Sequence, residues 1–273
     1  MTENEIRQLI EKGRNFIRSF NDEYEGYETD QELKKPQPPL VKDPMSSDIM
    51  PLPMNFEDLE IDNDFLNIIN SRSSHRVYTE ETMSLLELSY LLWCSQGIKE
   101  IRGKAYATLR TVPCGGARHE FECYMAIQNV EGLKDGLYHY LPLKHEIEKL
   151  GERDDLKQWI SDSLCEQSWA SKANIVFYYS VVFYRSEWRY GIFAHVPMMI
   201  DAGHITENVY LAATSIHKGG CAIAAVDGKA ADQAFGLDGV EETVFYAMPV
   251  GTIRASDRQA EQDFYAFVRE QGL

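Results

Sequence analysis

Hydrophobic positions divide the chain into a helical start, an irregular stretch and a folded remainder. The start has apolar residues at helical spacing: Ile6, Leu9, Ile10, Phe16 and Ile17. From about residue 21 to 60 this periodicity is lost among acidic residues and prolines, as in KKPQPPL and DPMSSDIMPLP. We expect an N-terminal helix and extended arm over residues 1–60, the arm lying over a surface of this subunit or a partner's. A folded domain is expected over residues 61–273.

Helical patterns return within the folded part. The stretch DNDFLNIINSR predicts a short helix with Asp62 as its N-cap. In SLLELSYLLWCSQGI, Ser84 and Glu87 are spaced as a capping box, and Gly97 is expected to end the helix. Further helices are expected at residues 154–163, at 198–217, in KAADQAFGL and from about residue 257.

Strand patterns alternate loosely with these helices. The candidates are rich in β-branched and aromatic residues: ECYMAIQ, GLYHY, NIVFYYSVVFY, GCAIAAV and TVFYAMPVG. No repeat period is evident. The pattern predicts an α+β sandwich, in which helices pack against one main sheet.

The helix expected at 198–217 is apolar almost all round, which is typical of a helix at the centre of a domain or in a subunit interface. Its polar residues Asp201, His204 and Asn208 follow three- and four-residue spacing and therefore share one stripe. Buried polar groups need partners, so we expect a local hydrogen-bond network along this stripe.

Composition excludes several classes of function. The 273 residues include 27 basic and 43 acidic side chains, a formal charge of -16 that argues against nucleic acid or an anionic membrane as a main partner. The N-terminus, MTENEIRQLIEKG, has no apolar signal core, so a cytoplasmic location is expected. Five cysteines without a CxxC pair indicate reduced thiols rather than a disulfide framework.

Three short segments could carry chemistry. In SRSSHRVY (71–78), two arginines four residues apart could converge on one anion with the help of serine hydroxyls, although a solvated basic turn has the same composition. In PCGGARHEFECYM (113–125) and HKGGCAIAAVD (217–227), paired glycines allow close backbone approach. Two such loops could form the faces of a slot for a planar ligand, or could be tight turns only.

These segments together resemble the FMN-dependent nitroreductase family, in particular its SagB-type dehydrogenase branch. Residues 72–78 are similar to the family pattern R-[RH]-S-x-[RK]-x-[FY], and Pro113–His119 to P-S-A-G-A-x-[HY]. The same order continues with these matching segments: MSLLELSYLLWCSQGI, NVEGLKDGLYHY, WRYG, DAGHITENVYLAA, GGCAIAAVDG and FGLDG. The resemblance covers roughly residues 65–254.

The resemblance implies a homodimeric α+β sandwich with a central, mainly antiparallel sheet flanked by helices, and two FMN sites at the interface. Arg72 and Ser74, with Ser73 alongside, would bind the FMN phosphate, and Arg76 would approach the flavin ring, where a cation stabilises reduced flavin. The partner subunit would contribute Pro113, Cys114, Gly115 and Gly116. The resemblance further places Ala222, Ile223, Ala224 and Ala225 near flavin N5, and Arg254 at a second phosphate contact.

The chain also departs from the family pattern. Ser73 replaces an arginine, and Cys114, a poorer hydrogen-bond donor, replaces a serine. Arg189 and Tyr190 stand where azoline oxidases carry a Lys-Tyr pair linked to deprotonating the peptide ring; arginine cannot act as that base. Tyr190 could donate a hydrogen bond to substrate or serve only in packing. Phe193 also replaces an arginine.

His195, Asp201 and His204 raise the question of a metal site, but residues 201–204 resemble a helix of the family that needs no metal, and helical spacing puts His195 off the start of that helix. We therefore expect no metal site. The chain has no GxSxG or P-loop pattern, so acyl and phosphoryl transfer have no support.

Three functional hypotheses follow. The first is an FMN oxidoreductase that takes hydride from NAD(P)H at flavin N5 and reduces a small acceptor such as a nitroaromatic or quinone. The second is a SagB-like dehydrogenase that oxidises a modified peptide or another substrate. The third is a degenerate flavin-binding module without catalysis.

Overall fold

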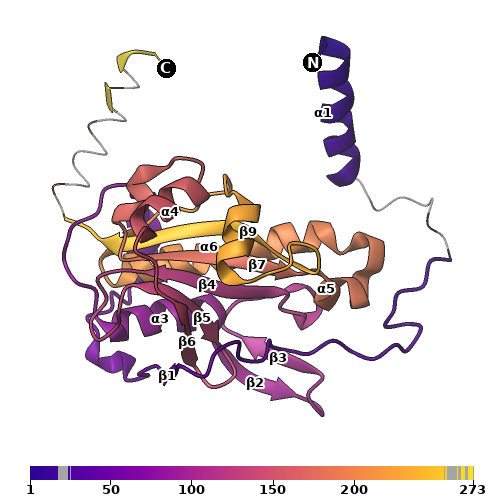
Figure 1. Ribbon diagram of the computed structural model, residues 1–273, viewed down its shortest axis with the longest axis horizontal. Helices are drawn as coiled ribbons and strands as arrows, with labels where there is room; N and C mark the ends of the chain where they lie inside the picture. The colour runs from indigo at the N-terminus through magenta and orange to yellow at the C-terminus, as the bar shows by residue number, and fades with distance from the viewer. Residues whose placement is uncertain are drawn as a thin grey trace.

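A seven-stranded sheet forms the centre of the computed structural model (Figure 1), which describes residues 1–17, 24, 26–254, 256, 263, 266–267 and 270–272. The strand order is β1-β6-β5-β4-β7-β9-β8, and every pairing is antiparallel. The strands are β1 (Ile49–Pro51), β4 (Phe121–Ile127), β5 (Gly136–Leu141), β6 (Glu146–Gly151), β7 (Ile175–Val182), β8 (Lys218–Gly220) and β9 (Glu242–Thr252). A separate hairpin joins β2 (Ile98–Arg102) to β3 (Ala107–Arg110).

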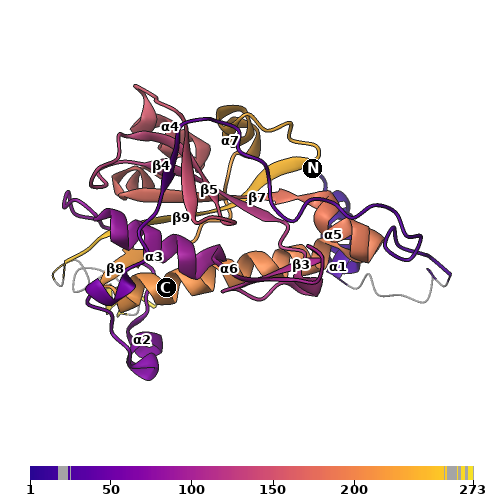
Figure 2. The ribbon, with the colours of Figure 1, turned by 90° about the horizontal axis from the view of Figure 1, so that it is seen from below.

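Helices cover both faces of the sheet (Figure 2). On one face lie α3 (Leu85–Gln96) and α6 (His195–Ser215), and on the other lie α4 (Leu156–Ser163) and α7 (Gly228–Phe235). The remaining helices are α1 (Glu3–Ile17), α2 (Phe65–Ser71), α5 (Phe183–Tyr190) and the short 3-10 turns η2 (Phe56–Asp58), η3 (Gly115–Ala117), η4 (Ser168–Lys172) and η5 (Gly191–Phe193). The predicted α+β sandwich with a mainly antiparallel sheet is confirmed.

The central strands are buried on both faces, which explains their apolar and aromatic composition. All seven residues of β4 are buried, with alternate side chains in the two cores. One core contains Met125 and Tyr179 with residues of α3 and α6, and the other contains Tyr124 and Tyr178 with residues of α4 and α7. Burial of large apolar side chains of this kind contributes about 1.5–3 kcal/mol each to folding.

Some element boundaries differ from the sequence expectation. The segment NIVFYYSVVFY is a strand only as far as Val182, because α5 begins at Phe183. In GCAIAAV only Gly220 belongs to a strand; Ile223 makes an isolated bridge to Ala247, and the chain then turns into α7. Strands β2 and β6 were not predicted, since the charged residues of IKEIR and EIEKLG hide the strand pattern.

Helix ends follow local capping. The Ser84–Glu87 capping box is present, and Gly97 follows the last residue of α3, as predicted. The N-cap of α2 is Asp64, not Asp62: the Asp64 carboxylate accepts the Asn67 N–H at 3.1 Å. Asp62 instead accepts the N–H of Asp64 at 2.9 Å, so it fixes the turn that leads into the helix.

The N-terminal segment has two different parts. Helix α1 forms as expected but buries none of its residues, and near its end Phe16 lines a pocket with Phe121 of β4 and Phe245 of β9. Residues 29–48 lie against the chain's own folded part: the Gln31 N–H donates to Trp188 O at 2.8 Å, and Lys42 forms a 2.5 Å ion pair with Glu242. The expected C-terminal helix falls mostly on residues outside those the structure describes. Within the described residues, no helix combines the length and apolar character needed to cross a membrane.

A cluster of buried charged side chains lies beneath residues 29–48. His139 Nδ1 donates to Glu148 Oε1 at 2.7 Å, and its Nε2 lies 3.4 Å from Glu122, which also pairs with Arg185 at 2.6 Å. Burial opposes the charged forms, but Arg185 and His139 outweigh it and hold the pKa of Glu122 well below its usual range. Burial would likewise lower the pKa of His139, yet the hydrogen bonds to Glu122 and Glu148 raise it.

Candidate functional site

The segment Arg72–Arg76 is fastened to the segment that follows α6. Ser74 forms a parallel bridge with Gly220, and the His75 N–H donates to Gly220 O at 2.9 Å. The His75 ring is buried against Gly219, where an added Cβ atom would lie 2.6 Å from His75 Cγ. The paired glycines are therefore needed for close approach of the two segments, which are about 145 residues apart in the chain.

Tyr210 on α6 connects the same two segments. Its hydroxyl accepts the Ala222 N–H at 2.7 Å and lies 3.2 Å from Ser74 Oγ. The Arg72 guanidinium stacks over the Tyr210 ring at 5.3 Å. Sequence reasoning missed Tyr210, because a single tyrosine in an apolar helix gives no signal of partners so far away in the sequence.

The other residues proposed for phosphate and ring contacts are placed separately. Ser73 Oγ lies 3.0 Å from His75 Nε2, and the Arg76 guanidinium lies 5.9 Å from the centre of the Trp169 ring. Arg254 is exposed and lies 3.7 Å from Glu81. The two arginines of the motif thus stack on different aromatic rings, and only Arg72 stands beside Ser74 and Tyr210.

Residues 222–225 present small side chains at the end of this segment. Ala222 is half-buried, and Ala224 and Ala225 are exposed. Ile223 differs, since its side chain is buried in the core and its N–H donates to Ala247 O at 2.7 Å. A flat ligand could therefore reach the backbone here at the alanines, whereas Ile223 holds the segment to the sheet.

A second cluster gathers the glycine loop after Pro113. The Gly115 N–H donates to Asp201 Oδ2 at 2.9 Å. Gly116 has a φ of 58°, and a Cβ atom there would lie 2.4 Å from Arg189 Cδ and 2.7 Å from the Tyr190 hydroxyl. The sequence-predicted residues Gly115, Gly116, Arg189 and Tyr190 are therefore in direct contact, and only glycine fits at position 116.

Arg189 is held by aromatic hydroxyls. Its Nη1 donates to the Tyr106 hydroxyl at 3.0 Å, and its guanidinium lies 5.7 Å from the centre of the Tyr190 ring. Partial burial lowers the pKa of Arg189, but Tyr190 and Tyr106 outweigh this, and the net shift is upward. Arg189 is therefore a fixed cation and not a base, in agreement with the expectation from residue type.

The two clusters are separated along α6. Asp201 anchors the glycine loop and Tyr210 anchors the Arg72–Arg76 segment, nine residues further on, which is about 13 Å along a helix. A single subunit thus presents the two halves of the candidate site at different points of one helix. Figure 2 shows β8 and α5 near opposite ends of α6.

The polar stripe of α6 makes the hydrogen bonds expected of it. His204 Nδ1 lies 3.2 Å from Asp201 Oδ1, and Asn208 Nδ2 donates to Cys94 O at 3.0 Å. His195 instead pairs with Glu187 at 3.0 Å. Of these two histidines, His204 contacts Asp201 and His195 contacts Glu187 instead.

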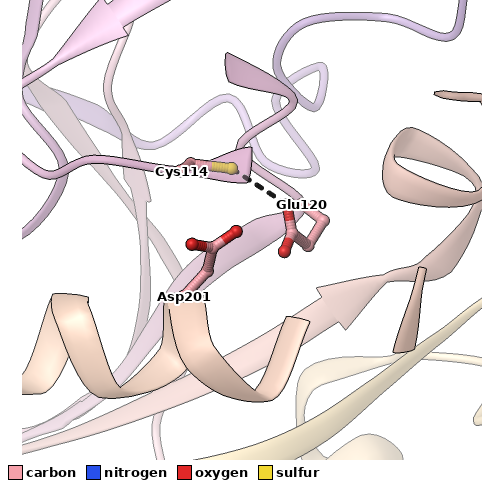
Figure 3. Close-up of side chains that lie close together, drawn as sticks. All are labelled: Cys114, Glu120 and Asp201. Atoms are coloured by element: carbon pink, nitrogen blue, oxygen red, sulfur yellow. Dashed lines mark hydrogen bonds between the residues drawn. The ribbon is translucent and has the colours of Figure 1, made fainter. Parts of the chain in front are cut away.

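Cys114 and Glu120 were not predicted to interact. The Cys114 thiol donates to Glu120 Oε2 at 3.2 Å and accepts the His119 N–H at 3.0 Å, while Asp201 lies beside both (Figure 3). Burial raises the pKa of Glu120 to about 7, and the nearby carboxylate of Asp201 adds to the rise. Burial also raises the pKa of the Cys114 thiol far above its usual value. The thiol is therefore a neutral group directed toward Glu120.

Comparisons with known proteins place this geometry in a family. The model of the Nitroreductase family matches residues 69–252, more than half of the chain. A protein of Methanocaldococcus jannaschii that is named a nitroreductase is 28% identical over 159 residues, which are 58% of this chain and 77% of that protein.

Three solved structures share the fold. A Ralstonia eutropha protein described as a nitroreductase is 19% identical with a TM-score of 0.63, covering 81% of this chain and 97% of that one. An Anabaena variabilis protein of the same description is 22% identical with a TM-score of 0.59 over 70% of this chain, which spans 38% of that protein's length. A chain of the E. coli microcin synthetase McbBCD complex is 16% identical with a TM-score of 0.55, covering 93% and 95% of the two chains. These identities show a common fold, and the family match shows that the chain belongs to the Nitroreductase family.

Proposed function

We propose that the protein is an FMN-dependent oxidoreductase that takes hydride from NAD(P)H and passes electrons to a small organic acceptor. The observation that carries this proposal is the joining of Arg72 and Ser74 to the glycine-rich segment at Gly219–Gly220 through Tyr210. This arrangement places a guanidinium, a hydroxyl and close-packed backbone together on an otherwise acidic protein. A phosphate group fits this set of donors.

The residues present fit FMN. Arg72 and Ser74 would hold the phosphate, with Ser73 alongside and Arg254 as a second basic contact. Arg76 would approach the flavin ring from the same segment. The exposed alanines Ala224 and Ala225 leave room for a flat ring system against the backbone. When bound, FMN supplies hydride chemistry at N5, and the protein side chains position and tune it.

A homodimer would complete the site. Within one chain, the loop of Pro113, Cys114, Gly115 and Gly116 contacts α6 at Asp201, about 13 Å along the helix from the position of Tyr210 beside Arg72. This loop would therefore contact the flavin of the partner subunit. Helix α6 has the apolar surface that such an interface requires: Met199 is 41% and Ile200 is 55% exposed in the single chain. A two-fold interface across this helix would give two equivalent sites.

Arg189 and Tyr190 would face substrate beside the glycine loop. The guanidinium stays protonated and can attract an anionic or electron-rich acceptor, while the Tyr190 hydroxyl can donate a hydrogen bond. Arg189 does not serve as a base at neutral pH. This favours direct hydride and electron transfer to a small acceptor over deprotonation of a peptide ring.

Absorbance spectroscopy and flavin titration test the proposal. We expect the purified protein to carry FMN and to bleach anaerobically with NADH or NADPH. Arg72→Ala is expected to weaken FMN binding by about 10-fold or more, because a charge-assisted hydrogen bond contributes about 1.5–3 kcal/mol. Arg102→Ala, on the exposed strand β2, is the matched control and should bind FMN as the wild type does. Colourless protein that does not bind added FMN refutes the proposal and favours the degenerate-module hypothesis.

A second candidate is a SagB-like dehydrogenase acting on a modified peptide. The observation that favours it is the fold shared over 93% of this chain with a chain of the microcin synthetase complex. This candidate predicts a flavin that NADH and NADPH leave oxidised and that a bound substrate reduces, with oxygen as the final acceptor. Rapid bleaching by a nicotinamide cofactor alone would contradict it.

A further inference from the structure

Three potential metal ligands converge beneath the glycine loop. Cys114 precedes η3, Glu120 precedes β4 and Asp201 lies on α6, yet one ligand atom of each lies within 4.8 Å of the others (Figure 3). The Cys114 Sγ is 3.2 Å from Glu120 Oε2. A thiol and two carboxylates, two from the loop between β3 and β4 and one from α6, therefore converge at one point.

One oxygen in this space has no partner. Glu120 is 0% exposed, and its Oε1 atom makes no hydrogen bond to the residues that the structure describes. Its carboxylate points into the space between Cys114 and Asp201 (Figure 3). Two ionised carboxylates that face each other in a buried place are costly, which is one reason that the pKa of Glu120 is raised; a proton or a cation between the two groups removes that cost.

The surrounding hydrogen bonds already orient the ligand atoms. The Gly115 N–H donates to Asp201 Oδ2 at 2.9 Å, and His204 Nδ1 lies 3.2 Å from Asp201 Oδ1. The His119 N–H donates to Cys114 Sγ at 3.0 Å. Contacts of this kind hold metal ligands in place, and carboxylate oxygens have further lone pairs for a metal.

We propose that Cys114, Glu120 and Asp201 bind a zinc ion, with water as a fourth ligand. One sulfur and two oxygen ligands suit zinc, whereas calcium and magnesium require more oxygen ligands. The thiol loses its proton to solvent when the metal binds. Zinc with three anionic ligands leaves a net charge of one negative unit, which the buried guanidinium of Arg110, close enough to interact with Cys114, balances in part.

This site goes beyond the proposed flavin chemistry and beyond the sequence expectation of no metal. It shares Asp201 with the group His195, Asp201 and His204, for which no metal site was expected, but takes its other two ligands from residues 114 and 120. None of the three ligands belongs to residues 72–76 or 218–225, so the zinc site and the proposed phosphate site are separable. Cys114 alone belongs to both proposals.

Zinc titration of the full chain tests the inference. The protein is stripped with a chelator, desalted and titrated with zinc sulfate by calorimetry, and bound zinc is counted by elemental analysis. Cobalt(II) serves as a second probe, because tetrahedral cobalt with a thiolate ligand absorbs at longer wavelengths than oxidised flavin. The FMN-to-protein ratio is read from the same samples. Glu120→Gln and Cys114→Ser are the test variants, and Cys165→Ser, which removes an exposed thiol, is the control.

We expect one zinc per chain in the wild type and in Cys165→Ser. Glu120→Gln and Cys114→Ser should each weaken zinc binding at least about 10-fold, since changes merely adjacent to metal ligands cost 10–100-fold. Circular dichroism shows whether each variant folds, and either variant alone suffices. Absence of zinc binding in the wild type, or equal binding by wild type and both test variants, overturns the proposal. If the wild-type protein binds zinc but carries no FMN, the result contradicts the flavin proposal and leaves the zinc proposal standing.

Discussion

Gly219 offers a sharp test of the candidate phosphate site. The perturbation is Gly219→Ala, which adds a single methyl group. Its Cβ atom would lie 2.6 Å from His75 Cγ, whereas ordinary contacts begin near 3.4 Å, so the two segments must separate by about 0.8 Å. The His75 side chain is buried, and the backbone carbonyl of His75 accepts a hydrogen bond from the Tyr78 hydroxyl at 2.8 Å. Moving the ring aside would therefore disturb well-packed surroundings.

The magnitude follows from the overlap. Overpacking a rigid site by one methyl group costs about 1–3 kcal/mol. For a domain of this size, that lowers the melting temperature by about 2–12 °C. The displaced segment carries Arg72 and Ser74, so FMN binding should weaken as well. Each 1.4 kcal/mol of binding free energy that is lost raises the Kd for FMN about 10-fold.

Thermal melts and FMN fluorescence titration measure both effects. Gly13→Ala is the matched control, because no atom lies within 4 Å of a Cβ at that exposed position of α1. The control should be unchanged or more stable by up to about 1 kcal/mol, from the higher helix propensity of alanine. If Gly219→Ala melts and binds FMN as Gly13→Ala does, the close packing of the two segments does not govern the site.

Three other predictions concern single hydrogen-bonding side chains, one in the site and two elsewhere in the fold. Tyr210→Phe should lose about 1 kcal/mol of unfolding free energy in urea and weaken FMN retention, because the Ala222 N–H loses its acceptor; an effect no larger than that of Tyr246→Phe would contradict this. His139→Gln should cost about 3–5 kcal/mol at pH 6 by leaving Glu122 and Glu148 without their shared partner. Because the pKa of His139 is raised on folding, its contribution is complete below the unfolded value of about 6.5 and is lost as pH rises through the folded value, so the cost should shrink in urea melts at higher pH. An equal cost at pH 6 and pH 9 would show that charge on His139 is not involved. Ser84→Ala should cost about 0.5–2 kcal/mol by removing the capping box of α3, measured by urea unfolding, and a neutral result would assign that helix end to tertiary packing alone.

Local patterns in the sequence were sufficient for the main elements of the fold. The strands around Tyr124 and Tyr178 are buried on both faces, so their residues are apolar throughout and strand propensity is plain. The cap of α3 depends on residues three positions apart, and a sequence displays such spacing directly. The elements that were missed, such as β2 and β6, are half-exposed and charged, so their strand character comes from pairing with neighbours.

The candidate site divides in the same way. The arginines and serines of residues 71–78 and the paired glycines of the two loops are distinctive by residue type, and the resemblance of the ordered motifs to a known family indicated Arg72, Ser74 and the pair Arg189–Tyr190. The sequence alone did not indicate the contacts of Tyr210 with Ser74 and Ala222, nor the convergence of Cys114, Glu120 and Asp201. These groups lie on different elements, and only the packing of α6 against the sheet and its loops brings them within a few ångströms of one another.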